Sequence, residues 1–165
     1  CLTVLYDPNA VQNATLTGTF TLQGRSTYDV PMTVEMYPVG EATVATYEFT
    51  PTASAGGELT VTGMAPGTYQ VAVKHSQYLQ VVETITLVAG DNSANFGELA
   101  AGDANNDNAV TALDFSALST SFNISAGAQG YNPAADFNGD GSVTALDFSL
   151  LSTNFNVSGE KPTAN

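Results

Sequence analysis

Basic residues are scarce in this sequence, which has three lysines and arginines against sixteen aspartates and glutamates. The resulting formal charge of −13 over 165 residues makes the chain repel nucleic acids and anionic membrane surfaces, because both are negatively charged. We therefore expect no nucleic-acid partner. The three basic residues are Arg25, Lys74 and Lys161.

Cysteine, histidine and tryptophan are also nearly absent. Cys1 is the single cysteine, which excludes an internal disulfide, although this residue could carry a lipid anchor. His75 is the single histidine, so a Ser-His-Asp triad has no credible base, and the sequence has no cysteine cluster for zinc and no glycine-rich phosphate loop. We expect no enzyme. The absence of tryptophan also makes a carbohydrate-binding module the weakest of the functional hypotheses.

Long apolar segments are missing too. No run reaches the roughly 18 residues that a transmembrane helix needs, and no signal peptide is present, so we interpret the sequence as a mature or trimmed chain. A low content of basic residues together with abundant Thr, Asn, Ala and Gly suits a secreted bacterial protein. We therefore expect an extracellular or cell-surface location.

Residues 1–99 alternate between apolar and polar side chains in the way that half-buried strands do. Leu2, Val4 and Tyr6 share one face, and the same period of two continues through 16–22 and 30–37. Turn residues separate later β-branched or aromatic stretches at 47–49, 59–61, 69–73, 81–87 and 96–99. We predict a mainly β chain with a small α part: an antiparallel β-sandwich over 1–99, a second domain over 100–157, and a tail over 158–165.

The segment GMAPGTYQVAVKHSQYLQ (63–80) places a Pro-Gly turn before one tyrosine-containing strand and a second turn before another tyrosine. In this it resembles the carboxypeptidase-regulatory-like (transthyretin-like) β-sandwich, over about residues 15–99. The resemblance implies a β-sandwich fold for this part of the chain.

From residue 100 onward, one acidic pattern occurs twice, 33 residues apart, as DANNDNAVTALD (103–114) and DFNGDGSVTALD (136–147). Ca²⁺ takes about 6–8 oxygen ligands, and a twelve-residue loop can wrap one ion. Each copy therefore predicts one calcium site, for two ions in all. The oxygen-bearing side chains stand at loop positions 1, 3, 5, 9 and 12: Asp103, Asn105, Asp107, Thr111 and Asp114, then Asp136, Asn138, Asp140, Thr144 and Asp147.

Each acidic loop continues into a short amphipathic segment, at 110–123 and 143–156. Phe115, Leu118 and Phe122 recur at helical spacing and predict one apolar face, and the second copy repeats the pattern. We expect two short helices that pack antiparallel, because neither could form a stable core alone.

No helix is predicted before either loop, which distinguishes the pattern from an EF-hand, and a duplicated loop followed by one helix resembles the type I dockerin domain over about 101–157. The resemblance implies further main-chain ligands at position 7, Ala109 and Ser142, and water-mediated contacts at most from Thr111 and Thr144. It also implies that Val110 and Val143 point into the core. Position 6 needs a positive φ, which Gly141 supplies better than Asn108, so we expect the first loop to bind calcium more weakly.

Dockerins bind cohesin modules, and their loop positions 10 and 11 often carry small hydroxyl residues that select the partner. Here these candidate partner-binding positions hold Ala112 and Leu113, then Ala145 and Leu146. This departure favours, as our first hypothesis, a self-associating subunit of a filament or surface layer, in which the Thr-rich segment of about 1–22 pairs with a neighbour's sheet edge. The alternative is a dockerin module with a companion sandwich that binds a cohesin-like module on a scaffold protein.

Overall fold

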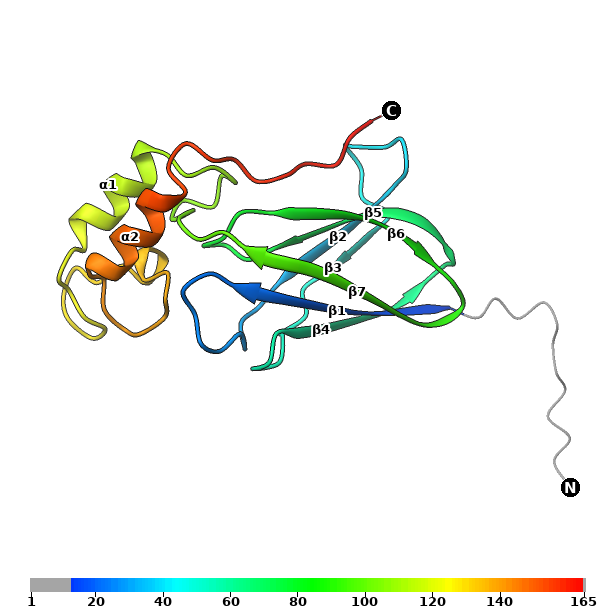
Figure 1. Cartoon of the computed structure of the whole chain (residues 1–165), viewed down its shortest axis with the longest axis horizontal. Coiled ribbons are helices and arrows are strands. Elements are labelled where there is room, and N and C mark those ends of the chain that lie inside the picture. Colours follow the sequence, from blue (N-terminus) through cyan, green and yellow to red (C-terminus); the bar gives the residue numbers. More distant parts are fainter. Residues whose placement is uncertain (1–12, 165) are drawn as a thin grey trace, which may run out of the picture.

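The computed structural model describes residues 13–164, which form a β-sandwich and a smaller helical part packed against one end of it (Figure 1). The expected strand at residues 2–6 and the possible lipid anchor at Cys1 lie outside the described residues. No helix among residues 13–164 is long and apolar enough to cross a bilayer.

Seven strands form the sandwich, in agreement with the predicted fold class. Their bounds are β1 (Ala14–Leu22), β2 (Thr33–Pro38), β3 (Tyr47–Phe49), β4 (Glu58–Met64), β5 (Gly67–Lys74), β6 (Val81–Leu87) and β7 (Gly90–Leu99). One sheet has three strands in the order β4-β1-β7, and the other has four in the order β3-β2-β5-β6. The period-two alternation of the sequence becomes the inner and outer faces of these sheets.

Strand β1 lies in the middle of the three-stranded sheet. Leu16 pairs with Val61 of the antiparallel neighbour β4 and with Asn92 of the parallel neighbour β7. Both edges of the Thr-rich strand are therefore occupied within the chain. The expectation that this segment is available to a neighbour's sheet is wrong for residues 14–22, because its hydrogen-bonding groups are already used.

The core between the sheets comes from the inward positions of β1, β2 and β5, including Leu16, Leu22, Val34 and Val71, each no more than 1% exposed. Gly18 interrupts the apolar series on β1. A Cβ at this position would lie 2.6 Å from Cε2 of Phe96, so the glycine makes room for an aromatic ring from the adjacent strand β7.

The helical part contains α1 (Ala112–Thr120), the 3-10 helix η1 (Pro133–Ala135) and α2 (Ala145–Thr153). Figure 1 shows α1 and α2 side by side and running in opposite directions, as expected. Its core is formed by buried residues of both repeats: Val110, Leu118, Ala135, Phe137, Val143 and Leu151. Val110 and Val143 are fully buried, as the resemblance implied.

The phenylalanines of the two helical segments differ from expectation. Phe115 and Phe122 were predicted to share the buried face with Leu118, yet they are 44% and 41% exposed. Leu118 and the loop valines already fill the small core, which leaves the larger rings at the surface. Phe115 and Phe148 contact each other edge to face, with ring centroids 6.0 Å apart.

Each repeat completes backbone hydrogen bonds of the other. Val110 in the first loop donates its N–H to the carbonyl of Val157, which follows α2, at 2.8 Å. Val143 in the second loop donates to the carbonyl of Ile124, which follows α1, at 3.0 Å. Each loop thus pairs with the segment that leaves the other repeat's helix.

The tail beyond residue 158 runs back over the four-stranded sheet (Figure 1). Thr163 donates its N–H to Oε1 of Gln70 on β5 at 2.8 Å, and Gln70 Nε2 donates to the Thr163 carbonyl at 2.9 Å. The side chain of Gln70 is buried by this contact, so the tail is part of the folded structure.

Candidate functional site

The two acidic loops have the same hydrogen-bond pattern. In the first, Asp103 at position 1 accepts the N–H groups of Asp107 and Asn108, both at 2.9 Å. In the second, Asp136 accepts the N–H groups of Asp140 at 3.2 Å and Gly141 at 2.9 Å. These partners are shifted by 33 residues, so the sequence repeat is also a repeat of backbone shape. The second loop adds one bond, from the N–H of Gly139 to Asp136 at 2.9 Å.

The aspartate at position 12 joins each loop to its helix. Asp114 accepts the N–H of Asn105 at 3.1 Å through one oxygen and that of Thr111 at 2.7 Å through the other. Thr111 is the N-cap of α1, and its hydroxyl oxygen accepts the N–H of Leu113 at 3.2 Å. Thr144 caps α2 in the same way. Both threonine hydroxyls, which were expected to contact metal only through water, therefore serve the helix N-termini.

The predicted turn at position 6 is present in both loops. Asn108 has φ of 67° and Gly141 has φ of 87°. Position 4 is also left-handed, at Asn106 and Gly139, with φ of 62° and 70°. The sequence analysis did not identify position 4. A signal was present, because positions 4 and 6 both hold Asn in the first loop and Gly in the second, and these residues adopt positive φ most readily.

Four of the six predicted ligand carboxylates are buried, with little positive charge to balance them. Asp103, Asp114 and Asp147 are fully buried and Asp136 is 4% exposed, whereas Asp107 and Asp140 are exposed. Within residues 13–164 the only ion pair links Lys74 and Asp103. Burying several like charges is costly unless a cation offsets them.

The donor set fits a hard divalent cation. No three Asp, Glu, His or Cys side chains in the described part of the chain are grouped closely enough to hold a metal alone. The remaining ligands would be amide and main-chain oxygens, namely those of Asn105 and Ala109, then Asn138 and Ser142, which are ligand types that a twelve-residue calcium loop uses.

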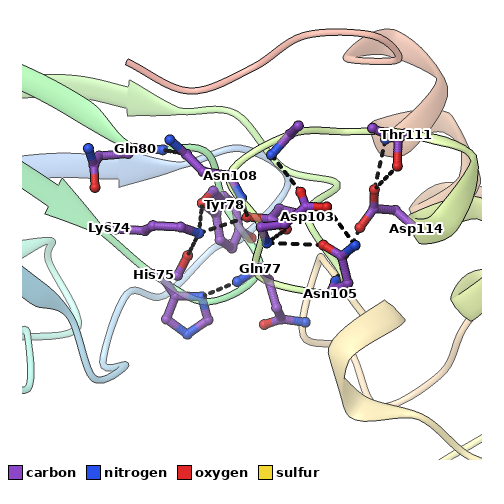
Figure 2. A network of polar contacts seen from close by, with 12 residues as sticks. Lys74, His75, Gln77, Tyr78, Gln80, Asp103, Asn105, Asn108, Thr111 and Asp114 are labelled. Carbon is purple, nitrogen blue, oxygen red and sulfur yellow. Dashed lines mark hydrogen bonds and ion pairs between the residues drawn. The ribbon is translucent and has the colours of Figure 1, made fainter. Parts of the chain in front are cut away.

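Both loops contact one segment of the sandwich, the β5–β6 loop at residues 75–80, and Figure 2 shows its contacts with the first loop. The Gln77 carbonyl accepts the N–H groups of Gly102 at 3.1 Å and Asp103 at 3.2 Å, at the start of the first loop. The side-chain amide of Gln77 donates to the carbonyls of Pro133 at 2.8 Å and Asp136 at 2.9 Å, at the start of the second. One residue of the sandwich thus holds the entrances of both loops.

Tyr78 is the fully buried centre of this contact. Its hydroxyl donates to the carbonyl of Phe137 at 2.5 Å and accepts a hydrogen bond from Nε of Arg25 at 3.1 Å. Burial raises the pKa of Tyr78 to about 12, so the phenol stays protonated and can donate.

Replacing Tyr78 with phenylalanine should lower the free energy of unfolding by about 1–3 kcal/mol, because the buried Phe137 carbonyl and Arg25 lose their partner. Urea unfolding followed by circular dichroism would measure the loss. Tyr28→Phe is the matched control, since Tyr28 is a half-buried tyrosine of the sandwich whose ring packs against Phe20. Equal stability of the two variants would contradict a structural role for the Tyr78 hydroxyl.

The first loop has contacts to the sandwich and the tail that the second lacks. Lys74 at the end of β5 donates to Oδ2 of Asp103 at 2.8 Å (Figure 2). Oδ1 of Asn108 accepts the N–H of Gln80 at 2.8 Å, and its Nδ2 donates to the carbonyl of Glu160 at 3.3 Å. Asn108 therefore does more than tolerate the turn, because its side chain joins loop, sandwich and tail.

His75 is a packed residue of the same segment. It is 8% exposed, and its Nδ1 accepts the N–H of Gln77 at 3.2 Å. Burial, with Arg25 and Lys74 nearby, lowers the pKa of His75 to about 4. The imidazole is therefore neutral near pH 7 and its ring is engaged in packing, as expected for a structural histidine.

The helices expose a pseudo-symmetric apolar face. Leu113 and Leu146 are 66% and 63% exposed, and the positions Ala112 and Ala145 are exposed beside them. The face also contains Phe115, Phe122, Phe148 and Phe155, each between 41% and 44% exposed. Shallow hollows between the helices are lined by Phe115 and Phe148. Exposed apolar residues gathered in this way mark protein interaction surfaces.

A β-sandwich whose end carries a duplicated loop–helix domain with an exposed apolar face defines a two-domain interaction module. Residues 101–156 match the family model of the dockerin type I domain. This part of the chain is a type I dockerin-like domain, as the acidic repeats indicated. Among curated proteins no significant match is found.

The solved structures with similar folds extend the likeness to the sandwich. A crystal structure of a type II cohesin–X–dockerin complex from Acetivibrio cellulolyticus, a C-terminal interface mutant, is 21% identical with a TM-score of 0.71. The match covers 88% of this chain and 97% of that chain. An N-terminal interface mutant of the same kind of complex matches equally broadly, with a TM-score of 0.70. At this identity the likeness shows the fold: both domains, in one arrangement.

Proposed function

We propose that this chain is a non-catalytic, extracellular adaptor whose dockerin-like domain binds two calcium ions and docks onto a cohesin-type domain of another protein. The observation that carries the proposal is the combined match of sandwich and dockerin-like domain to chains solved in cohesin complexes. The family model over 101–156 supports the same partner class.

The proposed docking surface is the apolar face of α1 and α2. Its central residues would be Leu113, Leu146, Phe115 and Phe148, with Ala112 and Ala145 at its margin. Their exposures are nearly the same in the two repeats, so the surface offers two equivalent sets of anchors. Large apolar side chains in the middle of an interface contribute most of the binding free energy.

The residues proposed to hold calcium are the predicted ones. Asp103, Asp107 and Asp114 with Asn105 and the Ala109 carbonyl would hold the first ion. Their counterparts in the second repeat would hold the other: Asp136, Asn138, Asp140, Ser142 and Asp147. Bound calcium would offset the buried carboxylates and so stabilise the domain that presents the apolar face.

The fold gives less support to self-assembly. The Thr-rich strand β1 has both edges paired, and the tail is bound to the chain's own sandwich. Both segments are therefore satisfied within one chain. Light scattering of the calcium-loaded protein should show a monomer, and filaments or large oligomers would favour the self-assembling subunit instead.

Isothermal titration against type I and type II cohesin domains tests the adaptor proposal, with the type II cohesin of the Acetivibrio cellulolyticus complex among the probes. We expect a complex with nanomolar affinity in millimolar calcium and none in excess EDTA. If the folded, calcium-loaded chain bound no member of such a panel, the cohesin assignment would be overturned.

A further inference from the structure

We propose that the sandwich supplies an internal cation to the first acidic loop: the Lys74 ammonium holds this loop folded without calcium and lowers its calcium affinity relative to the second loop. The inference rests on the proposed calcium function. It assigns to the sandwich a direct part in metal binding, in addition to its packing role.

The position of Lys74 carries the argument. Its Nζ lies 2.8 Å from Oδ2 of Asp103, 2.9 Å from the carbonyl of Tyr78 and 3.2 Å from the carbonyl of His75. Three acceptors match the three protons of the ammonium group. The Lys74 side chain is 15% exposed and that of Asp103 is fully buried, so solvent screens this ion pair only weakly.

Among residues 13–164, the second loop has no such ion pair. The Asp136 carboxylate accepts the hydroxyl of Tyr131 at 2.7 Å, a neutral donor from its own domain. Arg25 lies beside this loop at Gly139, but its guanidinium donates to Oε1 of Gln77 and to the Tyr78 hydroxyl. Each loop contains three aspartates, so direct pairing leaves a charge of −2 in the first loop (−3 + 1) and −3 in the second.

This difference has opposite effects in the two states of the loop. Without calcium, the ammonium offsets the buried Asp103 charge and fastens the loop to the sandwich. With calcium bound, the same ammonium repels the added positive charge. Removing it should therefore destabilise the calcium-free protein more than the calcium-loaded one, and thermodynamic linkage requires that calcium then binds more tightly.

The two loops can be followed separately in the intact protein. The N–H groups of Asn108 and Gly141 donate to the position-1 aspartates of their own loops, so their amide nuclear magnetic resonances report on each loop. Calcium titration of the ¹⁵N-labelled full chain, with a competing chelator, gives one Kd for each loop. In the unaltered protein we expect the second loop to fill first.

In Lys74→Met, which keeps the aliphatic length without the charge, we expect the Kd of the first loop to fall about tenfold and that of the second to change less than twofold. The calcium-free melting temperature should fall further than the calcium-loaded one. Lys161→Met is the matched control, because it removes the same charge from the exposed tail, and it should change neither Kd. Lys74→Arg keeps the charge and should stay within about threefold of the unaltered protein.

The outcomes separate the two proposals. If neither amide responds to calcium, calcium binding itself is wrong. If both respond but Lys74→Met leaves the first Kd unchanged or raises it, the internal-cation proposal is overturned. A Lys74→Met protein that stays unfolded in saturating calcium would overturn it too, because the ammonium would then be needed in both states.

Discussion

Chelating calcium with EDTA should strongly lower the stability of the helical part of this protein, while the stability of the sandwich changes little. A bound ligand stabilises the native state by about 4.1 kcal/mol per site at a thousand times its Kd. Two sites of that strength would equal or exceed the whole stability of a domain of 56 residues. We therefore expect calorimetry to show one transition of the helical part lowered by more than about 20 °C.

The variant Asp107→Ala with Asp140→Ala should reproduce this loss in the presence of calcium. Both side chains are exposed, so their removal leaves no cavity and acts mainly through the metal. Glu48→Ala with Glu83→Ala removes the same two charges from exposed strand positions and should leave melting unchanged. Melting that is indifferent to EDTA would show that the calcium assignment is wrong.

Truncating two aromatic rings should strongly weaken partner binding without unfolding the domain. Phe115 and Phe148 touch each other at the centre of the exposed apolar face. Central aromatic residues of an interface each contribute about 2 kcal/mol or more. Phe115→Ala with Phe148→Ala should therefore weaken cohesin binding by 100-fold or more in isothermal titration.

Two other exposed apolar residues provide the control for that variant. Val44 and Val88 lie on the sandwich and are 68% and 59% exposed. Val44→Ala with Val88→Ala should leave the cohesin Kd within about twofold, because scattered surface apolar groups do not form an interface. Circular dichroism must show native helix content in both variants. An unchanged Kd in the phenylalanine variant would place the partner elsewhere on the molecule.

The sequence was sufficient to predict the regular parts of this fold. Period-two alternation in the early segments, and β-branched or aromatic stretches between turn residues in the later ones, indicated the seven described strands. The last strand, β7, begins at Gly90 rather than near residue 96, and it pairs with β1 in parallel although an antiparallel sandwich was expected. The 33-residue repeat located both loops and both helices, and the dockerin resemblance implied that Val110 and Val143 lie in the core. Each of these features is determined by residues close together in the sequence or by the repeat spacing, so it can be predicted without knowing the tertiary contacts.

The side to which each phenylalanine points could not be predicted. Helical spacing grouped Phe115 with Leu118, but only the size of the core decides which of two apolar neighbours is buried. The core of the helical part is small and takes Leu118, so Phe115 is left for a partner. In a domain this short, the number of apolar residues at helical spacing therefore overestimates the number that are buried.

The contacts between the two domains could not be predicted from the sequence either. Nothing local in the sequence says that Lys74 meets Asp103, or that Gln77 and Tyr78 contact both loops. One signal was available, since two of the three basic residues of a strongly acidic chain, Arg25 and Lys74, lie against this contact. Asn108 was interpreted as a weaker substitute for glycine, whereas its side chain has partners of its own.

The exchanged pairing between repeats has a consequence for synthesis of the chain. Val110 pairs with Val157, so the first loop cannot complete its backbone contacts until 47 further residues have been made. The sandwich precedes both loops, and domains generally fold as units beginning with the N-terminal one. Its β5–β6 loop is therefore already in place on the ribosome when the acidic loops appear. Translation therefore produces the folded surface of the sandwich before the two acidic loops that pack against it.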